Sequence, residues 1–398
     1  MTRRVALAWA LISKGLRRIA QLVLPLRLQS RIRPGLDALV LATCKPSPRR
    51  DFGAVLCLHG LGDLILAARC IERLTQFMRS RNLKVRLFVA PQNVRFAQRY
   101  LDVDEVEGLD WMLFERDLLY RVRSVRSVAH RSGYALAVQP TFNRRLAVED
   151  SLIRATLAPE RWGTWGSPQF IHPYERPLGD SFYHRLIPDS REVMHDLERY
   201  REFMAALGLA IEASPWRLPS AALGRPIESP YLALCPQASD VVRTWSQESF
   251  LRAAGAVAQK HGWAIVVLGN AIGERLDLPP DGPSVLDLRG QTSNDELPAL
   301  LAAAELVLSN DSGPYHLGIA LGRPTLGVGG SGMPRRYFPY PAERLLRTRV
   351  VHRKVACEGC SWTCIHVPPV VTTAWCIEQV SWLEVAAAAE ALLCAEPH

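Results

Sequence analysis

The sequence predicts an α/β protein with two doubly wound parallel sheets in two domains. Three observations support this. Short apolar runs alternate with amphipathic helical segments along most of the chain, as in parallel sheets with helical crossovers. The alternation stops over residues 208–230, where Pro215, Pro219, Pro226 and Pro230 indicate a linker, and then restarts. The length of 398 residues suits two to three domains.

Composition and charge exclude several classes of protein. With 48% hydrophobic and 22% charged residues, the chain is neither disordered nor collagen-like, and no apolar run is long enough for a conventional membrane span. The net charge is +9, but residues 1–50 alone hold eleven basic side chains and one acid. Because the folded body lacks basic residues interleaved with aromatics, no nucleic-acid partner is expected.

The basic segment, residues 1–50, is expected to be an N-terminal extension that begins with an amphipathic helix. Its apolar residues recur at three- and four-residue steps (Val5, Trp9, Ile12, Leu16, Ile19 and Val23). Such a helix either lies on an anionic membrane surface or docks on the protein's own body, and the sequence leaves both open. A signal peptide is disfavoured because Lys14, Arg17 and Arg18 follow the apolar run at once.

The predicted elements follow in order. In the first domain, residues 51–222, strands are expected at 54–58, 85–90 and 135–138, and helices up to residue 79 and at 93–100, 146–157 and 195–207. Residues 159–190, rich in Pro, Gly and aromatics, predict an irregular loop. In the second domain, residues 223–398, strands are expected at 231–235, 264–268, 285–288, 306–309 and 325–328, and helices at 246–260, from Ser293 with Glu296 as its capping box, and at 313–321.

Ligands of such sheets bind beyond the carboxyl ends of the strands, and the loop after residue 309 carries the most chemistry. Ser312 is placed as a helix N-cap, Gly313 allows a ligand close to the backbone, and Pro314 suits the first helical turn. The free N–H groups of that turn favour phosphate, and His316 supplies a further donor. The alternative is an ordinary helix cap with a core histidine.

Two other loops follow strands. In the loop after residue 235, Ser239 and Arg243 suit a diphosphate, although Arg243 also fits as a surface charge. In the other loop, Gly60 and Gly62 form a tight turn that presents Asp63, a carboxylate suited to a general base or to capping the next helix. The turn is neither a dinucleotide fingerprint nor a P-loop, because the third glycine and the Gly-Lys-Ser/Thr run are absent.

Together these motifs resemble glycosyltransferase family 9, the bacterial heptosyltransferases, over about residues 53–385. The motifs that carry the resemblance follow the family's order (Gly62-Asp63, Arg243-Thr-Trp245, Gly290-Gln-Thr-Ser to Glu296-Leu, Asn310-Asp-Ser-Gly-Pro-Tyr-His316 to Pro324, and Gly329-Gly330 to Pro334). Gln237-Ala238 departs from the family's small or hydroxyl pair.

The resemblance implies a GT-B fold, with two Rossmann-like domains facing across a cleft. It implies that the first domain binds the acceptor and the second a nucleotide-sugar, typically ADP-heptose. It assigns Asp63 as the catalytic base and places the donor contacts at Ser239, Arg243, Glu274, Asp311, Ser312, Gly313 and His316.

The implied reaction is an inverting transfer of heptose that requires no cofactor. The implied acceptor is the inner core of lipopolysaccharide, an anionic glycolipid, and a protein acceptor is the alternative. The resemblance places the enzyme in the cytoplasm, in peripheral contact with the inner membrane. The alternative hypotheses are a nucleotide-sugar epimerase and a non-catalytic binding relative.

Nine cysteines, an odd number without a signal peptide, favour a reducing compartment. Four of them are spaced to close a structural zinc or iron site (Cys357, Cys360, Cys364 and Cys376), with His366 as a spare ligand. The alternative is a group of reduced thiols packed under Trp362, Trp375 and Trp382.

Overall fold

The computed structural model describes ten stretches of the chain. These are residues 26–45, 47–131, 133–189, 194–219, 223–270, 282–333, 335–341, 347–362, 364–366 and 373–395, with only the backbone of 26–31. The amphipathic segment 5–23 and Glu274 lie outside them. Contacts divide the chain into two compact units, and the second comprises Cys57–Phe77, Val89–Gly108 and Ser190–His398.

The first sheet has six strands in the order β3-β2-β1-β4-β5-β6, and β1 pairs in parallel with β4. Its strands are β1 Phe52–Cys57, β2 Lys84–Val89, β3 Glu105–Gly108, β4 Tyr134–Gln139, β5 Glu160–Thr164 and β6 Arg185–Ile187. The helices of this part are α2 Leu26–Ala42, α3 Leu61–Ser80, η1 Pro91–Asn93, α4 Val94–Tyr100, α5 Trp111–Arg116, α6 Leu118–His130, the π-helix η2 Leu146–Asp150, α7 Ser151–Ala155, α8 Arg176–Asp180 and α9 Asp196–Ala206.

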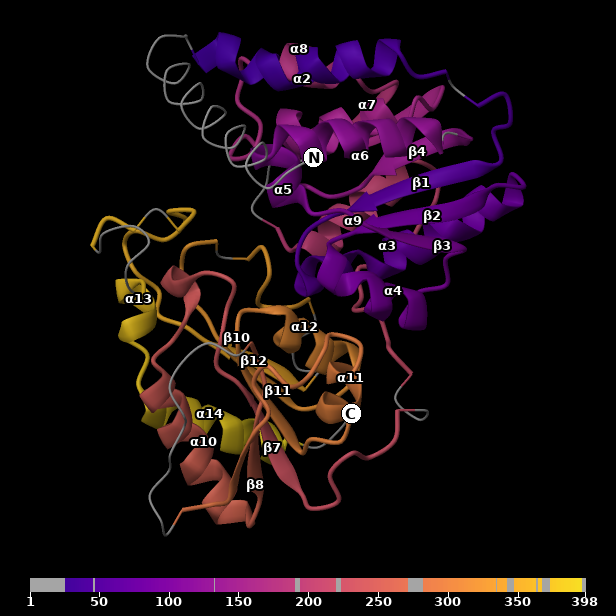
Figure 1. Ribbon diagram of the computed structural model, residues 1–398. Helices are drawn as coiled ribbons and strands as arrows, with labels where there is room; N and C mark the ends of the chain where they lie inside the picture. The colour runs from indigo at the N-terminus through magenta and orange to yellow at the C-terminus, as the bar shows by residue number, and fades with distance from the viewer. Residues whose placement is uncertain are drawn as a thin grey trace, which may run out of the picture. The chain divides into compact units, whose positions relative to one another are not determined.

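The second sheet has the order β12-β11-β10-β7-β8-β9, and its neighbouring strands pair in parallel. Its strands are β7 Tyr231–Cys235, β8 Ala264–Val267, β9 Val285–Asp287, β10 Leu306–Asn310, β11 Thr325–Val328 and β12 Thr348–Val351. Its helices are η3 Val241–Arg243, α10 Gln247–His261, α11 Leu297–Ala302, α12 Gly313–Ala320, α13 Trp375–Glu378 and α14 Trp382–Cys394. Figure 1 labels most of these elements.

Both sheets have the same winding. Counted along the chain within each sheet, the strands stand in the order 3-2-1-4-5-6, so the winding direction reverses between β1 and β4 and between β7 and β10. Ligands of doubly wound sheets bind where this reversal separates neighbouring loops. The predicted α/β class with two doubly wound parallel sheets is therefore confirmed, and its reversal points indicate where to look for a site. The domain limits 51–222 and 223–398 stay a prediction.

The prediction of an irregular loop over residues 159–190 was wrong. This stretch contains β5, α8 and β6, and β5 pairs in parallel with β4 while β6 pairs with β5. The two strands are short and carry charged residues such as Glu160, Arg161 and Arg185. They form because the neighbouring strand supplies hydrogen bonds, and a local apolar pattern does not predict such a tertiary effect.

Helix α2 lies within the predicted N-terminal extension but packs on the folded body. The Asp37 carboxylate accepts two hydrogen bonds from Arg121 of α6, at 2.5 and 2.7 Å, and both side chains are buried. Such a pair fixes the position of the helix, since removing one partner would leave the other charge buried and alone. Residues 26–42 are thus part of the body, whereas the membrane or body contact predicted for residues 5–23 lies outside the described residues.

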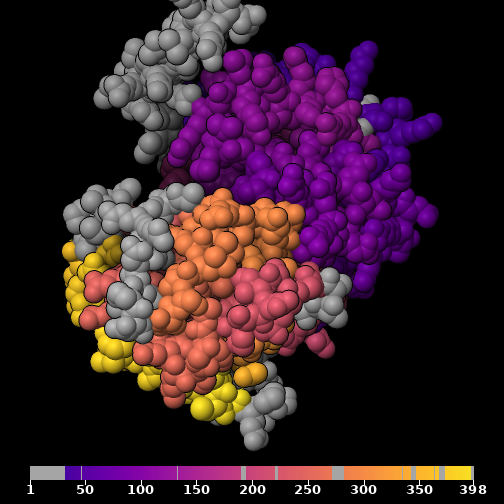
Figure 2. Space-filling model, turned by 60° about the horizontal axis from the view of Figure 1, so that its bottom comes forward, coloured from indigo at the N-terminus to yellow at the C-terminus, as the bar shows by residue number. Residues whose placement is uncertain are grey.

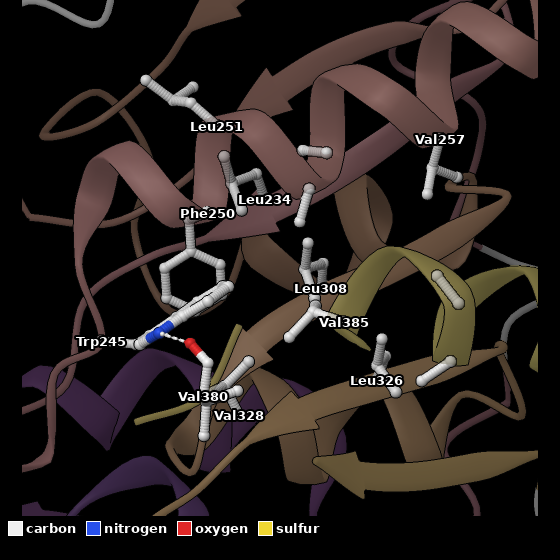
Figure 3. Packing of buried hydrophobic residues seen from close by; sticks show 14 of the residues in the cluster. Leu234, Trp245, Phe250, Leu251, Val257, Leu308, Leu326, Val328, Val380 and Val385 are labelled. Carbon is white, nitrogen blue, oxygen red and sulfur yellow. Dashed lines mark hydrogen bonds between the residues drawn. The ribbon is translucent and has the colours of Figure 1, made fainter. Parts of the chain in front are cut away.

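The core of the second sheet is a continuous apolar cluster between the strands and helices α10 and α14 (Figure 3). Trp245 is fully buried, packs edge-on against Phe250 at 4.7 Å between ring centres, and donates from its indole N–H to the Val380 carbonyl at 3.1 Å. Burying a side chain of this size contributes about 1.5–3 kcal/mol. In the space-filling view of Figure 2, the residues of this part, coloured salmon to yellow, pack against one another. Within the described residues, no helix combines the length and the apolarity that crossing a membrane requires.

Candidate functional site

Within the second compact unit, the N-terminal ends of α3 and α12 lie against each other at two glycines. A Cβ atom on Gly62 would lie 2.8 Å from His316 Cδ2, and one on Gly313 would lie 3.1 Å from Leu61 Cβ, so side chains there would separate the two ends. Asp63 is in the first turn of α3, where the helix dipole favours a negative charge. The structure therefore places Gly62, Asp63, Gly313 and His316 together.

Asp311 is the unusual group of this site. Its side chain follows β10 and is almost completely buried, yet Oδ2 has no hydrogen-bond partner in the described part of the chain. Oδ1 lies 3.9 Å from His316 Nε2, too far for a hydrogen bond. Burial raises the pKa of Asp311 to about 6, Arg243 opposes this, and Asp63 adds to it. Buried carboxylates normally have partners, so this one calls for a ligand.

His316 is buried one turn into α12, and its ring is neutral. Nδ1 lies 2.7 Å from the hydroxyl of Tyr340, and burial, His195 and Arg243 lower the pKa of His316 to about 3. The imidazole therefore offers a ligand a hydrogen bond and no positive charge. Ser312 stands at the N-cap position as predicted, but its hydroxyl lies 3.1 Å from that of Ser309 and does not cap the helix.

The loop after β7 brings a positive charge to the same place. Arg243 donates to the Ser239 hydroxyl, and Asp240 caps the short helix η3 between them. The charge of Arg243 lowers the pKa values of both Asp311 and His316, which places it within electrostatic reach of the loop after β10. Because β7 and β10 pair in parallel, Ser239 and Arg243, predicted as diphosphate contacts, lie on the loop next to the one that carries Asp311 and His316.

Asn310 holds these two loops together. Its Oδ1 accepts from the Trp245 backbone N–H at 2.9 Å, and its Nδ2 donates to the Pro236 carbonyl at 2.6 Å. Gln237, which departs from the family pattern, bonds through Oε1 to the Asn270 N–H at 2.6 Å. The sequence motif contains Asn310, but its clamping role follows only from the fold.

Sequence reasoning missed Arg336, a buried cation beside this site. Its guanidinium lies 3.3 Å from Asp196 Oδ1. Burial alone would lower the pKa of Arg336, but Asp196 and, further away, Asp63 hold it above the usual range, so the side chain stays charged. Arg336 also lowers the pKa of Asp311. It stands in an irregular segment after β11, where no pattern distinguishes it from its exposed neighbour Arg335.

The same segment supplies an aromatic wall. The His195 ring lies 4.5 Å from that of Tyr340, and its Nε2 is 2.9 Å from the Tyr337 carbonyl oxygen. Tyr340 in turn contacts His316. These residues position His316, and no local sequence pattern indicates them.

The cysteine-rich segment packs on the loop that follows β11, where the N–H groups of Gly359 and Ser361 donate to the carbonyls of Ser331 and Gly332, each at 2.8 Å. Cys376 is buried, and burial together with the nearby thiols of Cys360, Cys357 and Cys364 raises its pKa. The six-membered ring of Trp362 packs on Gly330 and Gly332. In the stretches that the structure describes, however, no three His, Cys, Asp or Glu side chains are arranged to hold a metal ion.

Known proteins resemble this chain in sequence. Residues 172–357 match the family model described as glycosyltransferase family 9 (heptosyltransferase). The lipopolysaccharide core heptosyltransferase OpsX of Haemophilus influenzae is 26% identical over 114 residues, which is 27% of this chain and 33% of that protein. The match thus spans a third of this curated relative's length.

Solved structures resemble it in fold. The Escherichia coli ADP-heptose lipopolysaccharide heptosyltransferase II superposes with a TM-score of 0.62 at 16% identity, covering 86% of this chain and 98% of that one. The E. coli heptosyltransferase WaaC with ADP gives 0.61 at 17% identity, covering 85% and 99%. The iron-containing dodecameric glycosyltransferase TibC of enterotoxigenic E. coli gives 0.50 at 16%, covering 87% and 77%. These likenesses confirm the predicted GT-B type of fold.

Proposed function

We propose that this chain is a member of glycosyltransferase family 9 and that it transfers a heptose from ADP-heptose to a hydroxyl of a lipopolysaccharide inner core with inversion at the anomeric carbon. Two similarities support the donor and the acceptor: the curated relative is a lipopolysaccharide core heptosyltransferase, and a solved neighbour is an ADP-heptose heptosyltransferase. The acceptor would make the protein work at the cytoplasmic face of the inner membrane.

The observation that carries the proposal is the unpartnered Oδ2 of Asp311 at the N-terminal end of α12. The free N–H groups of that end suit a diphosphate, and Gly313 lets it approach the backbone. A hydroxyl of the bound nucleotide-sugar would then supply the hydrogen bond that Asp311 lacks. Glu274, expected near the ribose, lies outside the described residues and stays part of the proposal.

Each neighbouring group has a chemical task in this proposal. Asp63 takes the proton of the acceptor hydroxyl as the oxygen attacks the anomeric carbon from the face opposite the diphosphate. Arg243, the end of α12 and the neutral His316 N–H stabilise the charge on the leaving diphosphate. Arg336 offsets the negative charges of Asp63, Asp196 and Asp311, which would otherwise oppose the binding of an anionic donor.

Replacing the base tests the proposal. Asp63→Asn keeps the shape of the side chain and removes the proton acceptor, so turnover should fall by about 10²–10⁴ while the affinity for ADP-heptose changes little. ADP release and acceptor glycosylation measure turnover, and calorimetry measures affinity. The matched control is Asp110→Asn, at the N-cap of α5. Near-normal turnover of Asp63→Asn would contradict the assignment of Asp63 as the base.

The acceptor is tested in the same assay. A delipidated inner core that lacks heptose should stimulate ADP release. Under the alternative hypothesis, a protein acceptor should stimulate ADP release and the inner core should not. Conversion of the nucleotide-sugar to an isomer without ADP release would instead indicate an epimerase.

A structural metal at Cys357, Cys360, Cys364 and Cys376 remains part of this proposal. It is supported by the ligand spacing, and TibC, a neighbour in fold, contains iron. Elemental analysis of tag-free protein should find about one zinc or iron per chain, lost in Cys357→Ser/Cys360→Ser together with thermal stability. A metal-free, fully active preparation would exclude a required metal.

A further inference from the structure

A group of apolar side chains is exposed on the helices beside the first sheet. Of the eleven large apolar residues that are strongly exposed in the described part of the chain, six lie on α2, α5 and α6. Four of these form the α5–α6 corner: Met112, Leu113, Leu118 and Leu119, which are 46, 47, 42 and 51% exposed. Exposed apolar groups gathered in this way mark an interaction surface.

The corner is rigid, so these side chains are held outward. Phe114 is buried beneath it, with the Arg121 guanidinium 4.3 Å above its ring. The Asp117 N–H donates to the Leu113 carbonyl at 2.7 Å, and the Asp117 carboxylate caps α6 by accepting from the Tyr120 N–H at 2.9 Å. Because Arg121 also pairs with the buried Asp37, the corner is anchored to α2.

Positive charges accompany the corner. Arg116, Arg123 and Arg126 are exposed, and none forms an ion pair with another described residue. Arg123 and Arg126 stand four and seven positions after Leu119, so they continue the same face of α6. The acids of these helices have other tasks, since Asp110 and Asp117 cap helices and Glu115 faces Arg145. The surface is thus apolar at its tip and basic along its flank.

We propose that the α5–α6 corner docks on an anionic lipid bilayer, with its four apolar side chains in the interface and the three arginines at the headgroup phosphates. Apolar groups flanked by Arg are the chemistry of interfacial binding, and the two contributions add. Four half-exposed side chains offer less than the roughly 800 Å² that each partner buries in a stable protein interface, which favours lipid over a second copy of the chain. None of its seven residues belongs to segment 1–25 or to the donor site.

Vesicle flotation with the full chain tests this. Vesicles of equal parts phosphatidylglycerol and phosphatidylcholine should bind the wild type, and phosphatidylcholine alone should bind it more weakly. Leu118→Ser/Leu119→Ser should weaken binding at least about tenfold, because two apolar side chains leave the interface. Arg123→Gln/Arg126→Gln should weaken binding to the anionic vesicles about tenfold, with the difference vanishing at high salt. The matched control is Leu383→Ser on α14, where the leucine is 60% exposed, and it should bind as the wild type does.

Thermal unfolding of each variant checks that it is folded, and its activity on a delipidated acceptor should match the wild type. That activity separates this inference from the proposed function, because vesicle binding does not require transfer. Wild-type protein that stays off the anionic vesicles would overturn the inference. Unchanged vesicle binding of Leu118→Ser/Leu119→Ser would also overturn it and would assign membrane contact to residues 1–25. So would a wild type that is a dimer, becomes a monomer in Leu118→Ser/Leu119→Ser and binds no vesicles, because the corner would then contact a second copy of the chain.

Discussion

Asp150 and Asp311 are two buried carboxylates that follow reversal-point strands of the two sheets, β4 and β10, and they differ in their partners. Both are almost completely buried, and burial raises the pKa of each to about 6. Asp150 accepts from Arg144 Nε at 2.6 Å, from Arg144 Nη2 at 3.2 Å and from the Tyr183 hydroxyl at 2.8 Å. Asp311 Oδ2 accepts no hydrogen bond in the described part of the chain.

The difference separates a structural carboxylate from a binding one. Burial and position in the sheet do not determine the role of a carboxylate, since Asp150 and Asp311 are alike in both. Their hydrogen-bond partners differ. An arginine from the same loop pairs with Asp150, whereas Asp311 Oδ2 is free to accept a hydrogen bond from a ligand. The pKa alone would rank the two as equal candidates for a functional site.

The largest effect is expected from removing the ion pair of Asp150, the structural carboxylate. Arg144→Leu leaves the Asp150 carboxylate buried without its ion pair, so the free energy of unfolding should fall by about 3–5 kcal/mol. Urea unfolding measures this. The control is Arg81→Leu, because Arg81 pairs with Glu160 at the surface and such a pair is worth about 0–1 kcal/mol. Equal effects of the two substitutions would show that the buried pair of Arg144 and Asp150 stabilises the fold no more than a surface pair, which would contradict the structural role of Asp150.

The next largest effect is expected at Asp311, the carboxylate assigned to binding. Asp311→Asn removes an unpaired buried charge, so at pH 7 the free energy of unfolding should rise by about 1–3 kcal/mol. Asp150→Asn should lower it, since the same change weakens the bonds to Arg144. If both substitutions destabilise the chain alike, then Asp311 has a partner that its surroundings in the structure do not show.

The pH dependence gives the sign of the same effect. With its pKa raised to about 6, Asp311 holds a proton in the folded chain over a range where the unfolded chain, with an ordinary pKa near 4, has released it. The folded state therefore binds more protons between about pH 4 and 6, and its stability falls as the pH rises through that window. The stability gain of Asp311→Asn should grow from pH 4 to pH 7. A pH-independent difference would contradict the raised pKa.

Arg243→Ala has the smallest expected effect, because this side chain is half-exposed. Unlike Arg144, it forms no ion pair with a buried carboxylate in the described part of the chain. ADP affinity should fall by about 1–2 kcal/mol, as for one charge-assisted contact, with the free energy of unfolding changed by less than about 0.5 kcal/mol. Calorimetry and urea unfolding measure the two quantities. A stability loss equal to the binding loss would mark Arg243 as structural.

The sequence predicted the parts of the fold that local patterns determine. Strands Tyr231–Cys235 and Thr325–Val328 lie where their apolar runs placed them, and the helix at Gly313 begins with the proline in its first turn. Strands such as β5 could not be predicted, since they depend on hydrogen bonds to a neighbour.

The site divides in the same way. Asp63, Asp311 and His316 follow strands that are visible in the sequence, so their convergence could be expected. Arg336 could not, because its burial depends on Asp196, 140 positions away along the chain. That Asp311 lacks a partner is a property of the folded surroundings, and no motif carries it.

Titration of ADP-heptose into the wild type and into Asp311→Asn tests most directly whether Asp311 accepts a hydrogen bond from the bound nucleotide-sugar. The wild type should bind the nucleotide-sugar, and Asp311→Asn, although more stable, should bind it about 10–100-fold more weakly, since the hydrogen bond to a charged acceptor is lost. Equal affinity of the two proteins, or a wild type that does not bind ADP-heptose at all, would contradict the account.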